Sequence, residues 1–396
     1  MKKAISLFLA FIMMLSLVAC AGTKEKEAPV VEETPAASAA SEEPFVLSMM
    51  LPVSGYPGAA KAYQNGAAIA VDEINAAGGV LGRQFEIVVE DMGTTPDVAL
   101  NAFNKIAAEG NSTVVLGCAF SSCALTLEYR LPEEKILMIS GATSPALAEI
   151  QNDYFFRGRT SDEYMARVAM SFIQGELAIP AGSKIGMLHD SSDFGVAAKD
   201  VFAELSEKDD YGFISEQFNT DDTDCATQVI KLENEGVDVI VVWTSSGFPV
   251  ASRAIYEQGV TCPVIGSAAV ANASVLTSCT EWIEGWYAVT DICLDAPIDG
   301  ITEFVESHNA KFDASELSFD ALTVYSWVYL LKDAIERAGS FETEAITAAL
   351  DETEDFVGLN GVYTKFGNVE LLNNATIGKI ESGEVHYITT AFAEIG

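Results

Sequence analysis

The sequence of 396 residues predicts an α/β fold with parallel β-sheets, organised as two consecutive lobes. Three observations support this prediction. Short β-rich runs alternate with longer helical patterns throughout residues 45–396. The short runs are almost continuously apolar, which is typical of parallel strands buried on both faces. The alternation starts anew after Thr160 and Ser161, which indicates a second α/β unit.

The first unit opens on an apolar run that indicates a buried strand. The helix that follows it places Ala67, Val71 and Ile74 on one stripe and ends before Gly78. The same criteria predict strands at residues 45–51, 85–90, 114–116 and 136–139, and helices at residues 59–77, 96–109 and 121–131.

The second unit repeats this alternation and is followed by three helices and a hairpin. In folds of this kind ligands bind beyond the carboxyl ends of the strands, so we expect a ligand cleft between the two units. The predicted strands are residues 184–189, 213–218, 237–243 and 264–265, the helices 194–208, 222–235, 249–258, 300–311, 319–338 and 343–350, and the hairpin 375–380 with 385–390.

The composition argues against several classes of function. The chain has 22 Lys and Arg against 58 Asp and Glu, a formal net charge of −36, so it lacks the clustered basic residues that bind nucleic acid. Its three histidines are far apart, which argues against a metal site. No nucleophile elbow, dinucleotide motif or P-loop occurs, and the pair His189-Asp190 alone does not predict a catalytic triad. We therefore expect no enzyme activity, no cofactor and no bound metal.

The N-terminus carries the pattern of an export signal. Lys2 and Lys3 precede an apolar run over residues 4–18. This run is too short for a comfortable membrane span, which needs ~20 residues, and it matches the apolar region of a secretory signal. No later segment approaches the length and apolarity of a membrane span.

The signal ends in Leu-Val-Ala-Cys, which resembles the lipobox of bacterial lipoproteins. This resemblance implies a signal peptide over residues 1–19, lipid attachment to Cys20 and an extracytoplasmic protein anchored to the cell membrane. Ordinary secretory cleavage, with Cys20 incidental, is the alternative. Residues 20–44 are rich in Ala, Glu, Pro, Ser and Thr and are predicted to form a disordered acidic tether.

Two segments of the first unit resemble a known family. Residues 51–55 read Leu-Pro-Val-Ser-Gly, and residues 71–79 read Val-Asp-Glu-Ile-Asn-Ala-Ala-Gly-Gly. They make the chain similar to the leucine/isoleucine/valine-binding family of type I solute-binding proteins, the extracytoplasmic receptors of ABC importers. The similarity extends from about residue 45 to the C-terminus, with further matches at residues 89–91, 141–147, 155–157 and 190–195.

The resemblance implies two Rossmann-like lobes joined by three crossovers, near residues 160–161, 290–291 and 374–375. The family closes these lobes over a small ligand, here an amino acid or a related carboxylate or amide, and delivers it to a membrane permease. A sensory protein that signals to a membrane receptor is the alternative, since the same fold serves both. The implied N-terminal lobe is residues 45–160 with 291–374, and the implied C-terminal lobe is residues 161–290 with 375–396.

The resemblance also implies where the ligand carboxylate lies. In relatives it meets hydroxyl and backbone N–H groups of two loops in the N-terminal lobe. Ser121 and Thr143 match the family's ligand-contacting serine and threonine, and Ser122 and Ala142 stand beside them. A helix start offers unpaired N–H groups and a positive partial charge, so it holds an anion without Lys or Arg. Helix capping is the alternative role for the three hydroxyl residues.

Four further residues are candidates for contact with the rest of the ligand. Phe194 falls where relatives often carry an aromatic residue over the ligand, and a half-buried place at a helix start is the alternative. Tyr56 and Phe120 are candidates for the wall of the side-chain pocket, with core packing as the alternative. Ser245 stands near another family contact position, where ordinary loop chemistry is the alternative.

One departure from the family bears on the ligand. Relatives that bind amino acids often place a Glu after the strand at residues 264–265, where it pairs with the ligand ammonium. Here residues 267–269 read Ser-Ala-Ala, with Ala268 in place of the Glu. A buried ammonium without a partner is costly, so either another acid takes this role or the ligand lacks a primary ammonium. Asp291 is the first substitute, with a solvated hinge acid as the alternative, and Asp320 is interpreted as a helix N-terminal charge or cap.

Six cysteines follow Cys20. An exported location permits disulfides and the even number fits them, but the sequence does not choose among the pairings. A bond between Cys118 and Cys123 would stiffen the candidate ligand loop, and free buried thiols are the alternative. The other four are Cys225, Cys262, Cys279 and Cys293.

Overall fold

The computed structural model describes residues 43–393 of the chain. The predicted signal peptide, the lipidation residue Cys20 and residues 20–42 of the predicted tether lie outside this range. Among the described residues, no helix combines the length and the apolarity that crossing a membrane requires.

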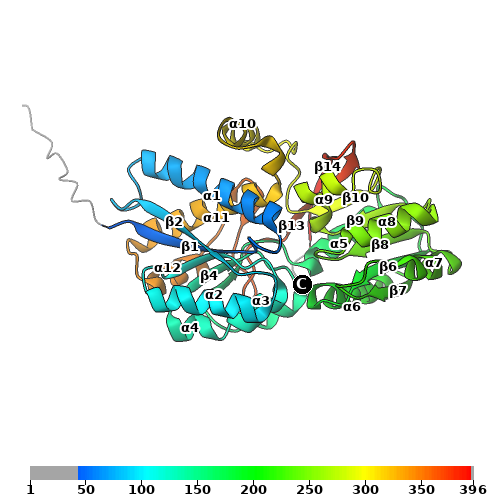
Figure 1. Cartoon of the computed structure of the whole chain (residues 1–396), viewed down its shortest axis with the longest axis horizontal. Coiled ribbons are helices and arrows are strands. Elements are labelled where there is room, and N and C mark those ends of the chain that lie inside the picture. The colour runs from blue at the N-terminus through cyan, green and yellow to red at the C-terminus, as the bar shows by residue number, and fades with distance from the viewer. Residues whose placement is uncertain (1–42, 394–396) are drawn as a thin grey trace, which may run out of the picture. The chain divides into compact units, whose positions relative to one another are not determined.

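The first five strands form a parallel sheet in the order β2-β1-β3-β4-β5 (Figure 1). β3 and β4 are buried along their whole length, because helices cover both faces of the sheet. The four predicted strands of this unit are present, and β5 is an additional short one. The strands are β1 Phe45–Leu51, β2 Phe85–Asp91, β3 Val114–Gly117, β4 Leu137–Ser140 and β5 Phe155–Arg157.

The second sheet has seven strands in the order β14-β13-β10-β9-β8-β6-β7. Its parallel part, β7-β6-β8-β9-β10, repeats the strand order of the first sheet. The predicted hairpin, β13 and β14, adds an antiparallel edge. The strands are β6 Lys184–Asp190, β7 Gly212–Phe218, β8 Val239–Trp243, β9 Val264–Gly266, β10 Tyr287–Thr290, β13 Asn374–Glu381 and β14 Glu384–Phe392, and a separate pair consists of β11 Phe356–Gly358 and β12 Gly361–Tyr363.

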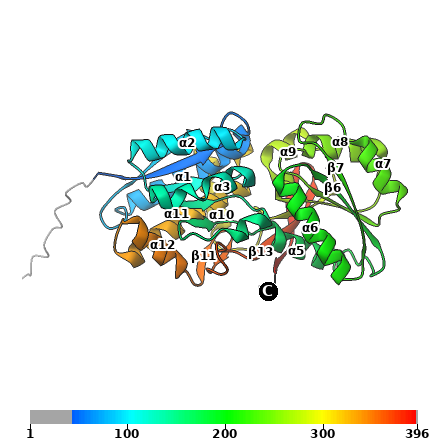
Figure 2. The ribbon, with the colours of Figure 1, turned by 90° about the horizontal axis from the view of Figure 1, so that it is seen from below.

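Helices cover both faces of each sheet (Figures 1 and 2). They are α1 Pro57–Ala76, α2 Pro96–Glu109, α3 Ser121–Leu127, α4 Arg130–Glu134, α5 Asp162–Gln174, α6 Asp193–Lys208, α7 Ala226–Asn234, α8 Phe248–Gln258, α9 Ala273–Ser278, α10 Ile301–Lys311, α11 Phe319–Ala338 and α12 Thr343–Asp351, with short 3₁₀ turns η1 Pro145–Glu149, η2 Ala268–Ala271 and η3 Ala314–Glu316.

The packing of α1 against α11 builds one side of the N-terminal core. A Cβ atom on Gly66 of α1 would lie 2.0 Å from the carbonyl oxygen of Ala321, so glycine lets the two helices approach closely. Their apolar residues pack with β1 on one face of the first sheet, while residues of α2, α3 and α4 form a second cluster on the other face.

Two helix predictions differ from the structure for local reasons. The predicted helix over residues 121–131 is broken into α3 and α4. The helix predicted from residue 222 begins only at Ala226, because two carboxylates hold the preceding residues as turns. Asp222 accepts the backbone N–H of Asn219 at 2.7 Å, and Asp224 accepts that of Ala226 at 3.1 Å.

Three chain segments connect the lobes: residues 158–161 after β5, the stretch between β10 and α11, and the stretch between β12 and β13. They carry buried polar contacts that fix the crossing region. Trp327 of α11 donates from its indole nitrogen to the carbonyl of Gly158 at 2.8 Å. Arg157, at the end of β5, pairs with Glu370 of the third segment at 3.3 Å. The fold is therefore the two-lobed, three-crossover architecture that the sequence predicts.

Candidate functional site

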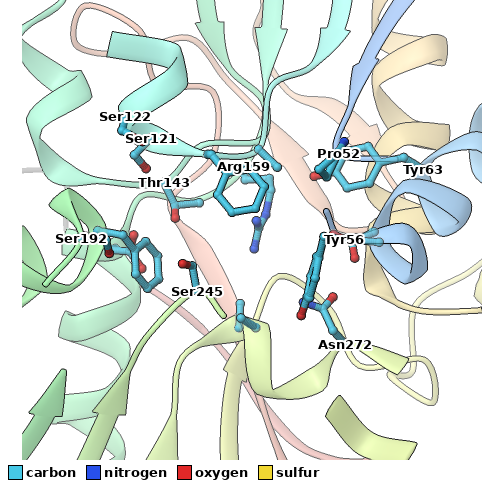
Figure 3. A pocket seen from close by; sticks show the side chains of 18 of the residues that line it. Pro52, Tyr56, Tyr63, Ser121, Ser122, Thr143, Arg159, Ser192, Ser245 and Asn272 are labelled. Carbon is cyan, nitrogen blue, oxygen red and sulfur yellow. The ribbon is translucent and has the colours of Figure 1, made fainter. Parts of the chain in front are cut away.

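A cavity of about 100 Å³, the cleft cavity, lies between the two lobes (Figure 3). Much of its lining comes from the loops that follow β1, β3 and β4 in one sheet and β6, β8 and β9 in the other, and the rest from α1, from residues after β5 and from the start of α11. These loops stand at the carboxyl ends of parallel strands, which is where α/β folds bind ligands.

Hydroxyl side chains from the N-terminal loops line one side of the cleft cavity. They belong to Ser121 and Ser122, at the start of α3, and to Thr143, in the loop after β4. The Ser121 hydroxyl oxygen accepts the backbone N–H of Ser144 at 3.2 Å, which ties the two loops together. The hydroxyl hydrogen of Ser121 remains a donor for a bound molecule.

Arg159 of the first crossover also lines the cleft cavity, and Asp291 of the second crossover neutralises it. The Arg159 Nε lies 3.0 Å from both carboxylate oxygens of Asp291, and its Nη2 lies 2.6 Å from one of them. Burial disfavours the guanidinium charge, but the Asp291 carboxylate outweighs burial and raises the pKa of Arg159. The pair is therefore a buried, bidentate ion pair.

Two of the predicted ligand contacts do not line the cleft cavity. Asp291 is 1% exposed, does not line the cleft cavity and already holds Arg159, so it is neither a solvated hinge acid nor free to pair with an ammonium. Ala142 is fully buried behind the cavity, and its backbone N–H donates to the hydroxyl of Ser140 at 3.2 Å instead of facing a ligand.

Asp162, the first residue of α5, brings an unpaired carboxylate oxygen to the cleft cavity. Its Oδ1 accepts the indole N–H of Trp243 at 2.8 Å, whereas its Oδ2 is buried and has no hydrogen-bond partner among the described residues. Burial raises the pKa of Asp162 to about 7, against the lowering effects of the neighbouring Thr143 side chain and of the Trp243 indole N–H. A cation beside this oxygen would relieve the cost of its burial.

Asp320, the second residue of α11, is a second buried acid in the lining. It is 3% exposed and accepts a hydrogen bond from the Ser318 hydroxyl at 3.1 Å. Burial raises the pKa of Asp320 to about 7, against the lowering effect of Arg159. Because Arg159 is bound by Asp291, Asp320 lacks a counter-ion of its own.

Tyr56 and Asn272 meet across the cleft cavity from the two lobes (Figure 3). The Asn272 amide nitrogen donates to the Tyr56 hydroxyl at 3.3 Å. The Asn272 amide oxygen is buried and lacks a partner within residues 43–393, so it adds another free acceptor to the lining. Ala268 and Ala269, at the position where relatives carry an acid, also line the cavity and supply no charge.

Aromatic rings form much of the remaining wall. Tyr56, Phe120 and Phe194 line the cleft cavity, as does Phe319, whose ring centre lies 5.0 Å from the guanidinium carbon of Arg159. These rings offer an apolar surface to the body of a ligand.

The structure brings most of the predicted residues together and adds others. Arg159, Asp162, Asn272 and Phe319 line the cavity but are not among the predicted residues, and Asp320 lines it although it is interpreted from sequence as a cap. The predicted residues that line the cleft cavity are Tyr56, Phe120, Ser121, Ser122, Thr143, Phe194 and Ser245.

The six cysteines of the described residues are all free thiols. The possible bond between Cys118 and Cys123 is therefore not formed, and both residues pack in the apolar cluster beneath α2 and α3. Burial raises the pKa of both thiols, to about 11 for Cys123. Within residues 43–393, no group of three or more His, Cys, Asp or Glu side chains is placed to hold a metal ion.

Comparisons with known proteins agree with this architecture. Residues 47–383 match the family model of periplasmic binding proteins. The Leu/Ile/Val-binding protein BraC3 of Rhizobium johnstonii is 25% identical over 348 residues, which cover 84% of this chain and 90% of that protein. The structure superposes on the leucine-binding protein LivK of Thermotoga maritima with a TM-score of 0.80 at 20% identity, covering 88% of this chain and 99% of that one.

A further structural match is LivJ of Streptococcus pneumoniae, solved in complex with isoleucine, with a TM-score of 0.77 at 23% identity. It covers 87% of this chain and 99% of that one. The family model spans most of the chain and the structural matches share its two-lobed fold. This chain therefore belongs to the periplasmic binding protein family, which confirms the resemblance to Leu/Ile/Val-binding proteins found in its sequence.

Proposed function

We propose that the chain is the extracytoplasmic solute-binding protein of an ABC importer and that it captures a small amino acid, or a related carboxylate or amide, by closing its lobes. Its family, the names of its relatives and the cleft cavity between the lobes all support this function. In this proposal the solute is held and released without chemical change.

The observation that carries the proposal is the arrangement of donors and acceptors in the cleft cavity. The hydroxyls of Ser121, Ser122 and Thr143 offer donors from one lobe. The free oxygens of Asp162 and Asn272 are buried acceptors without partners among residues 43–393. A zwitterionic amino acid satisfies both sets, because its carboxylate takes the donors and its ammonium takes the acceptors.

We assign the ammonium end to Asp162 and Asp320. Asp162 stands beside Thr143, whose carbonyl accepts the Asp162 backbone N–H at 2.8 Å. In an α-amino acid the ammonium and the carboxylate share one carbon, so acceptor and donor groups must lie this close together. An ammonium beside one of these acids would replace the counter-ion that relatives obtain from the Glu replaced here by Ala268.

Lobe closure is part of the same proposal. The ligand contacts groups of both lobes, so it binds the closed arrangement more tightly and shifts the population toward it. The Tyr56–Asn272 hydrogen bond is a contact that the closed lobes make directly. We further propose that the lobes comprise residues 45–160 with 291–374 and residues 161–290 with 375–396, and that Cys20 carries the lipid that holds the protein near its permease.

A thermal-shift screen of the full chain tests this function. The panel contains the common amino acids, their amides, and the matching acids that lack the amino group. At least one amino acid should raise the unfolding temperature, because a ligand that binds only the folded state stabilises it by mass action. The matching amine-free acid should give a much smaller shift. Equal shifts for both members of each pair would contradict the assignment of the ammonium end, and no shift with any amino acid or amide would contradict the function.

A further inference from the structure

A second cavity, the hinge cavity, lies beside the second crossover and has no part in the proposed function. Its volume is about 460 Å³, against about 100 Å³ for the cleft cavity. It is enclosed by α9, the second crossover, α10, η3 and the turn between β13 and β14. Its lining residues Val305, Leu317 and Phe319 belong to the same apolar cluster as the residues of the second sheet.

The wall of the hinge cavity is part apolar and part polar, and one of its lining residues carries an unpaired hydroxyl. Ile292, Leu294, Val305 and Phe319 supply apolar surface. Thr290 lies in the lining at 0% exposure, and its hydroxyl oxygen has no hydrogen-bond partner among the described residues. A buried hydroxyl without a partner is unfavourable, so a molecule that reaches it with a hydrogen-bonding atom gains an interaction that the free protein lacks.

The rim of the hinge cavity carries more negative than positive charge. Asp295 and Glu384 stand there with His386, whose ring nitrogens lie 3.6 Å and 3.9 Å from their carboxylates. Asp295 is also held in place, because it accepts the backbone N–H of Tyr387 at 2.9 Å. Because the rim has two carboxylates and only one histidine, its charge favours the binding of a cationic group.

A three-residue partition separates the hinge cavity from the cleft cavity. Ser318 and Phe319 line the hinge cavity, while Phe319 and Asp320 line the cleft cavity. The Ser318 hydroxyl donates to the Asp320 carboxylate at 3.1 Å, and the Phe319 ring lies against Arg159. A molecule in the hinge cavity thus touches the residues that position Asp320 and the Arg159–Asp291 pair.

We propose that the hinge cavity is a second ligand site, that it binds a small apolar amine with a hydroxyl at its far end, and that its occupancy is coupled to the cleft cavity. The ammonium lies at the Asp295 and Glu384 rim, the apolar body lies against Leu294 and Phe319, and the hydroxyl reaches Thr290. Coupling is reciprocal: whatever factor the amine imposes on the affinity of the cleft ligand, the cleft ligand imposes on the amine.

Titration calorimetry of the full chain at physiological salt tests the site, with tyramine as the probe. Tyramine should bind saturably, and 4-hydroxyphenylpropanoate, which reverses the charge, should not. Thr290→Val keeps the shape of the side chain but removes its hydroxyl, so it should weaken the binding of tyramine about 2- to 10-fold. The same variant should leave the affinity for phenethylamine, which has no hydroxyl, unchanged. Asp295→Asn should lower the affinity for both amines several-fold. Asp299→Asn, on the same crossover but outside the cavity, should leave both affinities unchanged.

Two further variants separate this site from the cleft. Val305→Phe fills the hinge cavity and should abolish tyramine binding, whereas Phe194→Ala, which alters only the cleft lining, should leave it intact. Loss of tyramine binding in Phe194→Ala but not in Val305→Phe would place the amine in the cleft and overturn the proposal. So would the absence of any heat with tyramine, which would mean that the cavity holds water only.

Coupling is measured by repeating the titration of the best cleft ligand with saturating tyramine, where we expect its affinity to change about 5-fold or more. An unchanged affinity would overturn the coupling. Because tyramine binding is measured without a cleft ligand, failure of the proposed function leaves the result on the hinge site interpretable.

Discussion

The strand-end loops and the crossover segments contribute different chemistry to the cleft cavity. The loops supply neutral groups: the hydroxyls of Ser121 and Thr143, the amide of Asn272 and aromatic rings. The crossovers and the helix starts that follow them supply the buried charges of Arg159, Asp162 and Asp320, and Asp291, which is outside the lining, neutralises Arg159.

The buried charges of the cleft cavity are therefore concentrated at the crossovers between the lobes. Arg159 and Asp291 neutralise each other, which leaves Asp162 and Asp320 as acids without counter-ions of their own. Because these charges lie on the crossovers and at the helix starts that follow them, a cation bound there would act directly on the segments that bend in the proposed lobe closure. The loops, by contrast, supply shape and hydrogen bonds.

The largest effect on stability is expected from removing the Arg159–Asp291 ion pair. Asp291→Asn leaves a buried guanidinium without its counter-ion, so the free energy of unfolding in urea should fall by about 3–5 kcal/mol. The matched control is Asp333→Asn, which removes an exposed carboxylate 2.8 Å from Arg337 and should cost less than about 1 kcal/mol. Similar losses for the two variants would show that the crossover pair is no more important than a surface pair.

Replacing one of the unpaired acids should separate affinity from stability. Asp320→Asn should lower the affinity for an amino-acid ligand about 10- to 100-fold, because a hydrogen bond to a charged group contributes ~1.5–3 kcal/mol. The same change should stabilise the free protein at pH 8, since burial disfavours the Asp320 carboxylate. Calorimetry and urea unfolding measure the two effects, with Asp193→Asn at the exposed edge of the cavity as the control. Loss of both affinity and stability would mean that Asp320 has a structural role only.

The unpaired acids also predict a pH dependence. The pKa values of Asp162 and Asp320 are raised from 3.8 to about 7, so the folded protein holds protons that the unfolded chain has lost between these values. The free energy of unfolding should therefore decrease as the pH rises from about 4 to about 7. Amino-acid affinity should change in the opposite direction and rise up to roughly tenfold per pH unit below 7 for each acid that must ionise.

Calorimetry between pH 5.5 and pH 8 measures this slope. The double variant Asp162→Asn with Asp320→Asn should flatten it. An equally steep slope in the double variant would mean that other groups titrate on binding.

The smallest effect is expected from a single loop hydroxyl. Ser121→Ala should lower the affinity for the ligand about 2- to 10-fold, because one neutral hydrogen bond contributes ~0.5–1.5 kcal/mol net. Ser171→Ala is a matched control, since Ser171 is exposed on α5 and its hydroxyl donates to the backbone of Arg167. If Ser121→Ala binds like the control, the carboxylate end of the ligand does not lie at α3.

The contrast between loops and crossovers also explains what the sequence predicts well. Strands and helices follow local patterns, so the long parallel strands and helices such as α2 and α11 agree closely with their predicted ranges. The loop residues carry family motifs, and seven of them line the cleft cavity. Short elements such as β5 and β10 give too few residues for a periodic pattern and are missing from the prediction.

Local sequence patterns do not predict how the buried polar and charged residues pair, because the partners are far apart in the sequence. Arg159 and Asp291 are 132 positions apart, and Tyr56 and Asn272 are 216 apart. The sequence shows that a counter-charge for an ammonium is missing at Ala268, but not which acid remains free after the ion pairs form. Only the structure shows that Asp291 is already paired with Arg159, which leaves Asp162 and Asp320 as the candidates for binding the ligand ammonium.

The proposed function requires that an amine-bearing small molecule enters the cleft and leaves it unaltered. Native mass spectrometry of the full chain measures this when each amino acid and its amine-free counterpart compete at equal concentration. We predict one bound amino acid per chain, of unchanged mass after release, with little of the amine-free acid. Equal occupancy by both, or a released molecule of altered mass, would contradict the proposed function.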